Sequence, residues 1–168
     1  LILFTSLPLT SFNNKDINEE VKTYVKFSVS GNQINNTFNI SGDQDNSSQN
    51  VTAMIYPDGN SGEYKIAELS FMDGAQEMSV LLKVPAKKGL IELKEGNAKF
   101  NLNISIGDIS LVAQSVSVNI EEVVIDKIMR MKASYVKGSF EGIAVHRYTK
   151  NSTEFKEPYM VSGNFQFM

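Results

Sequence analysis

Apolar and polar residues alternate at every second position through most of this chain, and this period of two constrains the fold more than any other feature. In residues 21–30 the odd positions carry Val21, Val25, Phe27 and Val29, whereas the even positions are mostly polar. Successive side chains of a β-strand point to opposite faces of a sheet, so such a segment has one dry and one wet face. One-sided strands of this kind favour antiparallel sheets over buried parallel ones.

The same alternation returns along the chain, and turn-forming dipeptides separate the alternating segments. Further runs of this kind cover residues 78–84, 98–106, 116–120 and 129–135. Turn signals include Gly31-Asn32, Asp73-Gly74, Lys88-Gly89, Glu95-Gly96-Asn97 and Gly107-Asp108. Glycine and asparagine tolerate positive φ, which tight hairpin turns require. The pattern predicts an all-β fold, an antiparallel meander of about nine to eleven strands that forms a β-sandwich or a partly closed, calycin-like β-barrel.

One segment, residues 120–131, fits two kinds of element. Val123, Ile125 and Met129 alternate as in a strand, whereas Val124 and Ile128 have helical spacing. The centre of the segment is rich in β-branched residues, which pack well on a pleated sheet. We therefore favour a strand here and keep a short helix as the alternative.

Length and composition exclude several classes of protein. A chain of 168 residues with 21% charged residues is expected to form one domain, and we assign residues 21–168 to it. The chain has no cysteine, which excludes a disulfide scaffold, a thiol nucleophile, an iron–sulfur cluster and a cysteine-ligated zinc site. Its net charge of −3 and the absence of a basic run argue against nucleic-acid binding.

The first twelve residues, Leu1–Phe12, are uncharged and mostly apolar. They are too few to cross a bilayer as a helix, which needs about 20 residues. Their length and the break at Pro8 are typical of the apolar region of a signal peptide. We predict a truncated signal peptide and linker over residues 1–20, and export to the periplasm, the cell surface or the medium. An ordinary core strand and a strand donated to a neighbouring subunit remain alternatives. No later apolar run is long enough to predict a transmembrane span in the mature chain.

Short motifs near both ends of the domain carry a family resemblance. Val25–Asn32 reads as a strand that runs into a Gly-Asn turn, and Gly138-Ser-Phe140-Glu-Gly142 precedes a polar loop and then Gly163-Asn-Phe165-Gln-Phe167. This pairing resembles an uncharacterised family of small secreted and lipoprotein all-β proteins from Bacteroidetes. The resemblance implies export and an all-β fold and supplies no catalytic residues. The chain lacks the lipid-attachment cysteine of the lipoprotein members, which leaves surface anchoring open.

The same motifs make a packing prediction that needs no family. Phenylalanine rings at Phe140, Phe165 and Phe167 are expected to share one sheet face. Glycines opposite aromatic residues leave room for the rings, and glycine permits a sharp bend at a barrel corner. The glycines in question are Gly138, Gly142 and Gly163.

The sequence contains little that predicts catalysis or a metal site. His146 is the only histidine, is expected on the wet face, and no Gly-x-Ser-x-Gly motif offers a nucleophile. One histidine cannot supply a histidine-rich zinc site. Asp43–Ser47 places oxygen ligands at alternate positions, but Ser48 and Met54 occupy the places where an EF-hand loop needs glycine and glutamate. We therefore predict no enzyme activity, no metal and no cofactor.

The loop before the last strand is the best candidate binding site. Tyrosine and arginine are common binding anchors on loops of rigid sheets. The candidate ligand-binding residues are His146, Arg147, Tyr148 and Tyr159. We predict an exported, non-enzymatic envelope β-domain that binds a small ligand, a glycan or a partner protein. A structural, self-associating surface subunit with a donated N-terminal strand is the alternative, and an enzyme comes third.

Overall fold

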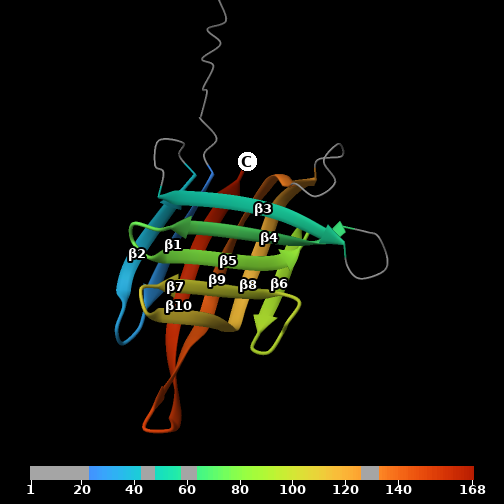
Figure 1. Cartoon of the computed structure of the whole chain (residues 1–168). Coiled ribbons are helices and arrows are strands. Elements are labelled where there is room, and N and C mark those ends of the chain that lie inside the picture. The colour runs from blue at the N-terminus through green and yellow to red at the C-terminus, as the bar shows by residue number, and fades with distance from the viewer. Residues whose placement is uncertain (1–22, 43–47, 58–63, 126–132) are drawn as a thin grey trace, which may run out of the picture.

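The computed structural model describes residues 23–42, 48–57, 64–125 and 133–168, and its ten strands form one continuous sheet (Figure 1). All regular elements of the described residues are strands, which confirms the predicted all-β fold. No helix in this part of the chain could cross a membrane. The strands are β1 (Tyr24–Ser30), β2 (Asn35–Ser41), β3 (Gln49–Pro57), β4 (Tyr64–Asp73), β5 (Met78–Pro85), β6 (Gly89–Lys94), β7 (Asn101–Ile106), β8 (Ile109–Ile125), β9 (Ala133–Lys150) and β10 (Thr153–Phe167).

The strands follow an antiparallel meander that nearly closes on itself. The order in the sheet is β2-β1-β10-β9-β8-β7-β5-β4-β3, with β6 paired to β8 beside this path. The N-terminal strand β1 therefore lies against the C-terminal strand β10, with Val25 opposite Phe165. The two ends of the path, β2 and β3, share no ladder, but the Ser41 hydroxyl and amide both donate to Gln49 Oε1 at 3.1 Å. The sheet is thus a partly closed barrel.

The barrel is flattened into two layers whose strands run across each other (Figure 1). Strands β3, β4, β5 and β7 form a front layer, and β1, β2, β6, β9 and β10 form a back layer. Strand β8 belongs to both, because Ile109–Val112 pairs with β7 and Ser115–Ile120 pairs with β6. The register of β8 against β9 shifts between Ala113 and Ser115, at the point where β8 passes from one layer to the other. Such irregularities bend a strand at a barrel corner.

The core lies between the two layers and is made of the residues that the alternation assigns to dry faces. Val25, Phe27 and Val29 of β1 are at most 1% exposed, whereas Lys26 and Ser30 face solvent. The runs over residues 78–84, 102–104 and 116–120 behave in the same way. They place Met78, Val80, Leu82, Val84, Leu102, Ile104, Val116, Val118 and Ile120 in the core.

The run over residues 129–135 does not behave in this way: residues 129–132 lie outside the described residues, and Tyr135 is partly exposed whereas Val136 is buried. The register of β8 against β9 shifts beside Tyr135, and such an irregularity interrupts the alternation.

One predicted strand starts later than the alternation suggests. Residues 98–100 do not belong to β7, which begins at Asn101. The reason is the Asn97 side chain, whose Oδ1 accepts the backbone N–H groups of Lys99 at 2.9 Å and Phe100 at 3.1 Å. This Asx-type turn gives these two backbone N–H groups a local hydrogen-bond acceptor and so competes with the sheet ladder. Phe100 is half-buried and packs at the edge of the core.

The ambiguous segment is a strand as far as it is described, since β8 continues through Ile125. Residues 126–132 lie outside the described residues, as do the predicted signal peptide and linker, residues 1–20.

Two of the three glycines of the closing motifs, Gly138 and Gly163, face phenylalanine rings across neighbouring strands, as predicted, whereas Gly142 lies against the backbone of β8 at Ser115 and Val116. A Cβ atom added at Gly163 would lie 2.7 Å from Phe140 Cζ, and one added at Gly138 would lie 2.8 Å from Phe165 Cζ. Each glycine is the register partner of its ring, with β9 pairing to β10. Phe140 and Phe165 are buried, and Phe167 packs against the core with partial exposure. These pairs hold the last two strands at close packing distance.

Candidate functional site

The predicted polar loop is a hairpin of two long strands that extends past the rest of the barrel (Figure 1). Only Asn151 and Ser152 separate β9 from β10, and their φ angles are 50° and 62°. Two central residues with positive φ make a turn whose twist matches that of the flanking strands. The polar loop expected before the last strand is therefore a two-residue turn, which lets the ladder continue to its end.

Three of the four predicted binding residues lie on one face of this hairpin. His146 is the register partner of Glu157, and alternation places His146, Tyr148 and Tyr159 on the same side. Arg147 points to the opposite side of β9, where its register partner is Lys156. The structure thus brings three predicted residues together and separates the fourth from them.

A row of stacked rings covers this side of the hairpin. The ring centroids of His146 and Tyr148 are 5.4 Å apart, and those of Tyr148 and Phe155 are also 5.4 Å apart. The interplanar angles are 22° and 14°, which describes stacked rather than edge-to-face contacts. Phe155 is 41% exposed. We call these three residues, His146, Tyr148 and Phe155, the aromatic face.

Glu157 is the hub below the aromatic face, and the sequence alone did not single it out. Its carboxylate accepts hydrogen bonds from Gln33 Nε2 at 3.0 Å, from the Tyr148 hydroxyl at 3.0 Å and from the Tyr159 hydroxyl at 3.3 Å. Gln33 belongs to the turn between β1 and β2, so the hub ties the base of the long hairpin to the first hairpin. The hydrogen bond from Gln33, followed by that from Tyr148, lowers the pKa of Glu157.

The tyrosines of this cluster are hydrogen-bond donors at neutral pH. The hydrogen bond to the Glu157 carboxylate raises the pKa of Tyr148, and burial raises the pKa of Tyr159. The Tyr159 ring is buried against Gly31, where a Cβ added to the glycine would lie only 2.3 Å from Tyr159 Cδ1.

The His146 ring is fixed by a backbone contact. Its Nδ1 lies 3.0 Å from the Ser110 carbonyl oxygen, and Nδ1 must carry a proton because a carbonyl oxygen only accepts hydrogen bonds.

Arg147 belongs to an ion network on the other side of the hairpin. Its guanidinium contacts the Glu95 carboxylate, and its Nη1 donates to Glu154 Oε1 at 2.6 Å. Lys156 Nζ lies 3.3 Å from the same Glu95 carboxylate. Because Glu95 belongs to the turn after β6, the network braces the hairpin from its back.

The described residues contain no group of three or more histidine, aspartate or glutamate side chains that could hold a metal ion. The Asp43–Ser47 segment, considered above as a calcium loop, lies outside the part of the chain that the structure covers.

The sequence matches no family model, and no characterised protein or solved structure matches the chain.

The Glu157 hub gives a prediction for pH dependence. A carboxylate whose folded pKa is lowered contributes stability above its ordinary pKa of 4.5, and this contribution disappears as the pH falls through the folded pKa. We expect Glu157→Gln to be less stable than the wild type at pH 7, with a gap that closes as the pH falls below about 4. Denaturant unfolding between pH 3 and 7 measures this gap.

NMR titration of the Glu157 carboxyl provides the second measurement. Tyr148→Phe keeps the ring stack and removes one donor, so it should raise the pKa of Glu157 toward the ordinary value. A wild-type Glu157 that titrates at 4.5 or above would contradict the assigned hydrogen bonds.

Proposed function

We propose that this chain is an exported, non-enzymatic β-domain of the bacterial envelope that binds a partner protein through the aromatic face of the β9–β10 hairpin. The observation that carries the proposal is the arrangement of this hairpin. A row of stacked rings, exposed at Phe155 and partly exposed at His146 and Tyr148, lies on a projecting element that is braced at its base by Glu157 and on its back by Arg147.

The bracing favours tight binding because it reduces the entropy that a partner must remove. Aromatic side chains have few rotatable bonds and present a large contact area at low entropic cost. Tyr148 is further fixed by its hydrogen bond to Glu157 and by ring contacts on both sides. A preordered surface of this kind loses less freedom on association than a mobile loop does.

The open position of the aromatic face favours a protein over a small ligand. Small-molecule sites are usually concave and enclose most of the ligand. Here the rings lie along a projecting hairpin, and Phe155 at its outer end is 41% exposed. Tyrosine and other aromatic residues dominate the energy of protein interfaces, which are flatter.

The protonation states of the cluster support the non-enzymatic part of the proposal. A general acid or base works best with a pKa near the operating pH. The pKa of Glu157 is lowered, and the pKa values of Tyr148 and Tyr159 are raised, so all three move away from neutrality. These groups act as fixed donors and an acceptor that hold the rings in place.

The export part of the proposal depends on the sequence of Leu1–Phe12, which resembles the apolar region of a signal peptide. N-terminal sequencing of the mature protein tests this part, and retention of Leu1–Phe12 would contradict it.

Site-specific photo-crosslinking tests the partner. A benzophenone amino acid is placed at position 155 of the full chain, in cells of the source organism, and at position 72 as the matched control. Met72 is 45% exposed and lies on β4, away from the hairpin, so the control reports accidental neighbours. We expect one defined protein adduct from position 155 that is absent from position 72.

The purified partner is then titrated with the wild type and with Phe155→Ser. Loss of a central aromatic anchor typically costs 2 kcal/mol or more, so we expect affinity to fall by about 30-fold or more. Equal adducts from both positions, or unchanged affinity in Phe155→Ser, would contradict the proposal. Adducts between two copies of this chain would replace it with the self-associating surface subunit.

A further inference from the structure

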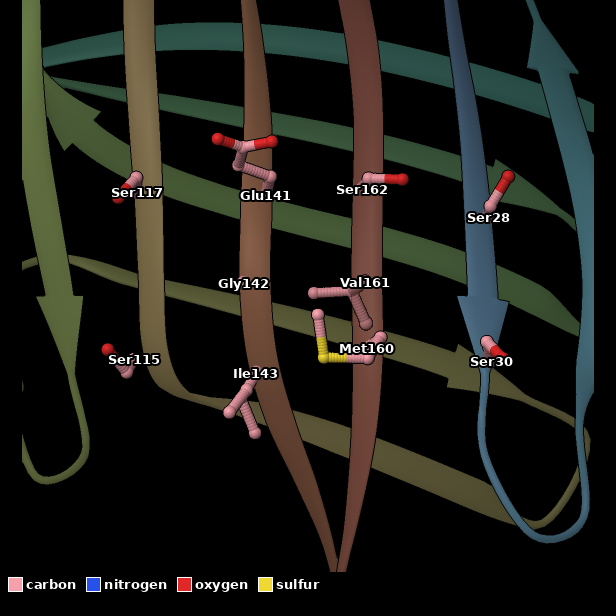
Figure 2. Close-up of a pocket in the computed structure, with 10 residues that line it drawn as sticks. All are labelled: Ser28, Ser30, Ser115, Ser117, Glu141, Gly142, Ile143, Met160, Val161 and Ser162. Carbon is pink, nitrogen blue, oxygen red and sulfur yellow. The ribbon is translucent and has the colours of Figure 1, made fainter.

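A shallow hollow of about 470 Å³ lies on the outer side of the back layer, away from the core and from the aromatic face (Figure 2). Figure 2 views this side from outside, with the strands of the front layer behind it. The hollow is in the volume range of ligand sites, about 300–1,000 Å³. We call it the serine trough, and its lining is Ser28, Ser30, Ser115, Ser117, Glu141, Gly142, Ile143, Met160, Val161 and Ser162.

The register of the sheet aligns the polar residues of the trough in one row. Ser28 faces Ser162, Ser162 faces Glu141, and Glu141 faces Ser117 across four neighbouring strands. The row is continued by Thr37 on β2 and Glu92 on β6. Hydroxyl groups from residues far apart in sequence thus lie side by side on one surface.

The trough is hollow because short side chains lie between longer ones. Met160, at one end, is 60% exposed, and Leu90, at the other, is 71% exposed. A second hollow of about 230 Å³ shares Ser117, Glu141 and Ser162 and extends the depression to Leu90. Exposed hydrophobic side chains beside a polar floor mark a surface that can contact a ligand with both kinds of group.

Glu141 provides a carboxylate at the centre of the trough, between Ser117 and Ser162 (Figure 2). Other polar groups of the row are paired with each other: the Ser28 and Thr37 hydroxyls lie 2.8 Å apart, and Ser117 donates to Glu92. Among the residues that the structure describes, none donates a hydrogen bond to Glu141 and none forms an ion pair with it. Its acceptor oxygens are therefore available to a ligand.

We infer that the serine trough binds a neutral saccharide. Serine hydroxyls both donate and accept, and a carboxylate accepts strongly, which complements the hydroxyl groups of a sugar. Met160, Ile143 and Leu90 can contact the apolar C–H faces of the sugar rings. No lining residue of either hollow is basic, and Glu141 repels anions, so the geometry disfavours phosphorylated or acidic ligands.

The position of the trough distinguishes a saccharide from an extended peptide. Peptides that bind β-sheets usually add a strand at an edge, where backbone N–H and C=O groups are free. The trough lies over β1, β10, β9 and β8, whose backbone groups are paired with neighbouring strands on both sides. A ligand here meets side chains only, and the floor is mainly hydroxyl.

Two-dimensional ¹H–¹⁵N NMR titration of the full chain tests this inference. The probes are neutral oligosaccharides, namely maltotriose, cellotriose, chitotriose and xylotriose. We expect at least one to shift amide signals of Ser117, Glu141 and Ser162 saturably, with a Kd below about 10 mM. Glu141→Gln keeps the shape and removes the charge, and should weaken binding by about tenfold or more.

Ser162→Leu fills the trough and should abolish these shifts. Asn39→Leu is the matched control, because it makes a polar-to-leucine change at an exposed position on β2 of the same layer, outside the trough. Thermal unfolding verifies that each variant is folded.

Absence of saturable shifts with every oligosaccharide would overturn the inference. Shifts confined to the β9–β10 hairpin, or shifts that persist in both Ser162→Leu and Glu141→Gln, would also overturn it. The crosslinking result at position 155 does not depend on the trough, so the two proposals fail independently.

Discussion

Gly142→Ala is expected to lower the free energy of unfolding by about 3 kcal/mol or more, enough to leave much of the chain unfolded if its stability is typical. A Cβ atom at this position would lie 2.2 Å from the Ser115 carbonyl oxygen and 2.8 Å from Val116 Cα. Both atoms are backbone, so no side-chain rotation relieves the contact. The φ angle of Gly142 is +149°, which adds strain for any residue with a side chain.

The position of Gly142 explains why the contact is so close. Gly142 pairs with Val116 on β8, directly after the register shift between Ala113 and Ser115. Here β8 passes from one layer to the other, and β9 must follow it at short range. Moving the strands apart would disturb the ladder on which both layers depend.

Chemical denaturation of Gly142→Ala and wild type, followed by circular dichroism, measures the loss. For a domain of this size, 3 kcal/mol corresponds to a fall in Tm of roughly 10 °C. Gly74→Ala is the control, because its added Cβ would be 3.6 Å from its nearest neighbour, the Ser48 carbonyl oxygen. We expect Gly74→Ala to change stability by less than about 1 kcal/mol. A Gly142→Ala variant as stable as this control would show that β8 and β9 do not approach as described.

The structural features that depend on a local residue pattern, such as the buried face of a strand, were predictable from the sequence. The alternation in β1 and β5 identified buried residues such as Phe27 and Leu82, because a strand fixes the direction of each side chain by position alone. The pairing of Gly138 and Gly163 with phenylalanine rings was also predictable, since each glycine and the ring that it faces belong to short Gly-x-Phe motifs. The start of β7 was missed because a single side chain, Asn97, decides it.

The candidate site was only partly predictable, because it depends on register and on distant residues. His146, Tyr148 and Tyr159 were selected by residue type, but Glu157 required the hairpin register. That register could have been counted outward from a two-residue turn at Asn151-Ser152, had this turn been recognised. No local signal brings Gln33 to Glu157, since they are 124 residues apart in the chain. The serine trough likewise exists only after neighbouring strands are aligned.

Asp73 carries the second large prediction, because it is the only buried charged residue in the described part of the chain, at 1% exposure. Its carboxylate accepts hydrogen bonds from Gln49 Nε2 at 2.8 Å, from the backbone N–H groups of Ala75 and Gln76 at 3.0 and 3.3 Å, and from the Ser48 hydroxyl and Gln76 Nε2. Asp73 thereby joins the turn between β4 and β5 to the start of β3.

Asp73→Ala removes the acceptor from all of these donors at once. Leaving one buried donor unsatisfied costs about 1–3 kcal/mol. Partial access of water to these donors reduces their total cost. We expect a loss of about 2–4 kcal/mol in the free energy of unfolding at pH 7. Asp108→Ala, at an exposed turn position, is the control and should change stability by at most about 0.5 kcal/mol.

The pH dependence of this loss separates the charge of Asp73 from its shape. The hydrogen bond from Gln49 lowers the pKa of Asp73 despite the opposing effect of burial. The stabilising contribution is therefore complete above the ordinary pKa of 3.8 and is lost as the pH falls through the lower folded value. Denaturant unfolding of the wild type and Asp73→Ala should show a large gap at pH 7 that narrows below pH 4. A gap that stays constant to pH 2.5 would mean that packing of the side chain, rather than its ionised carboxylate, holds the turn against β3.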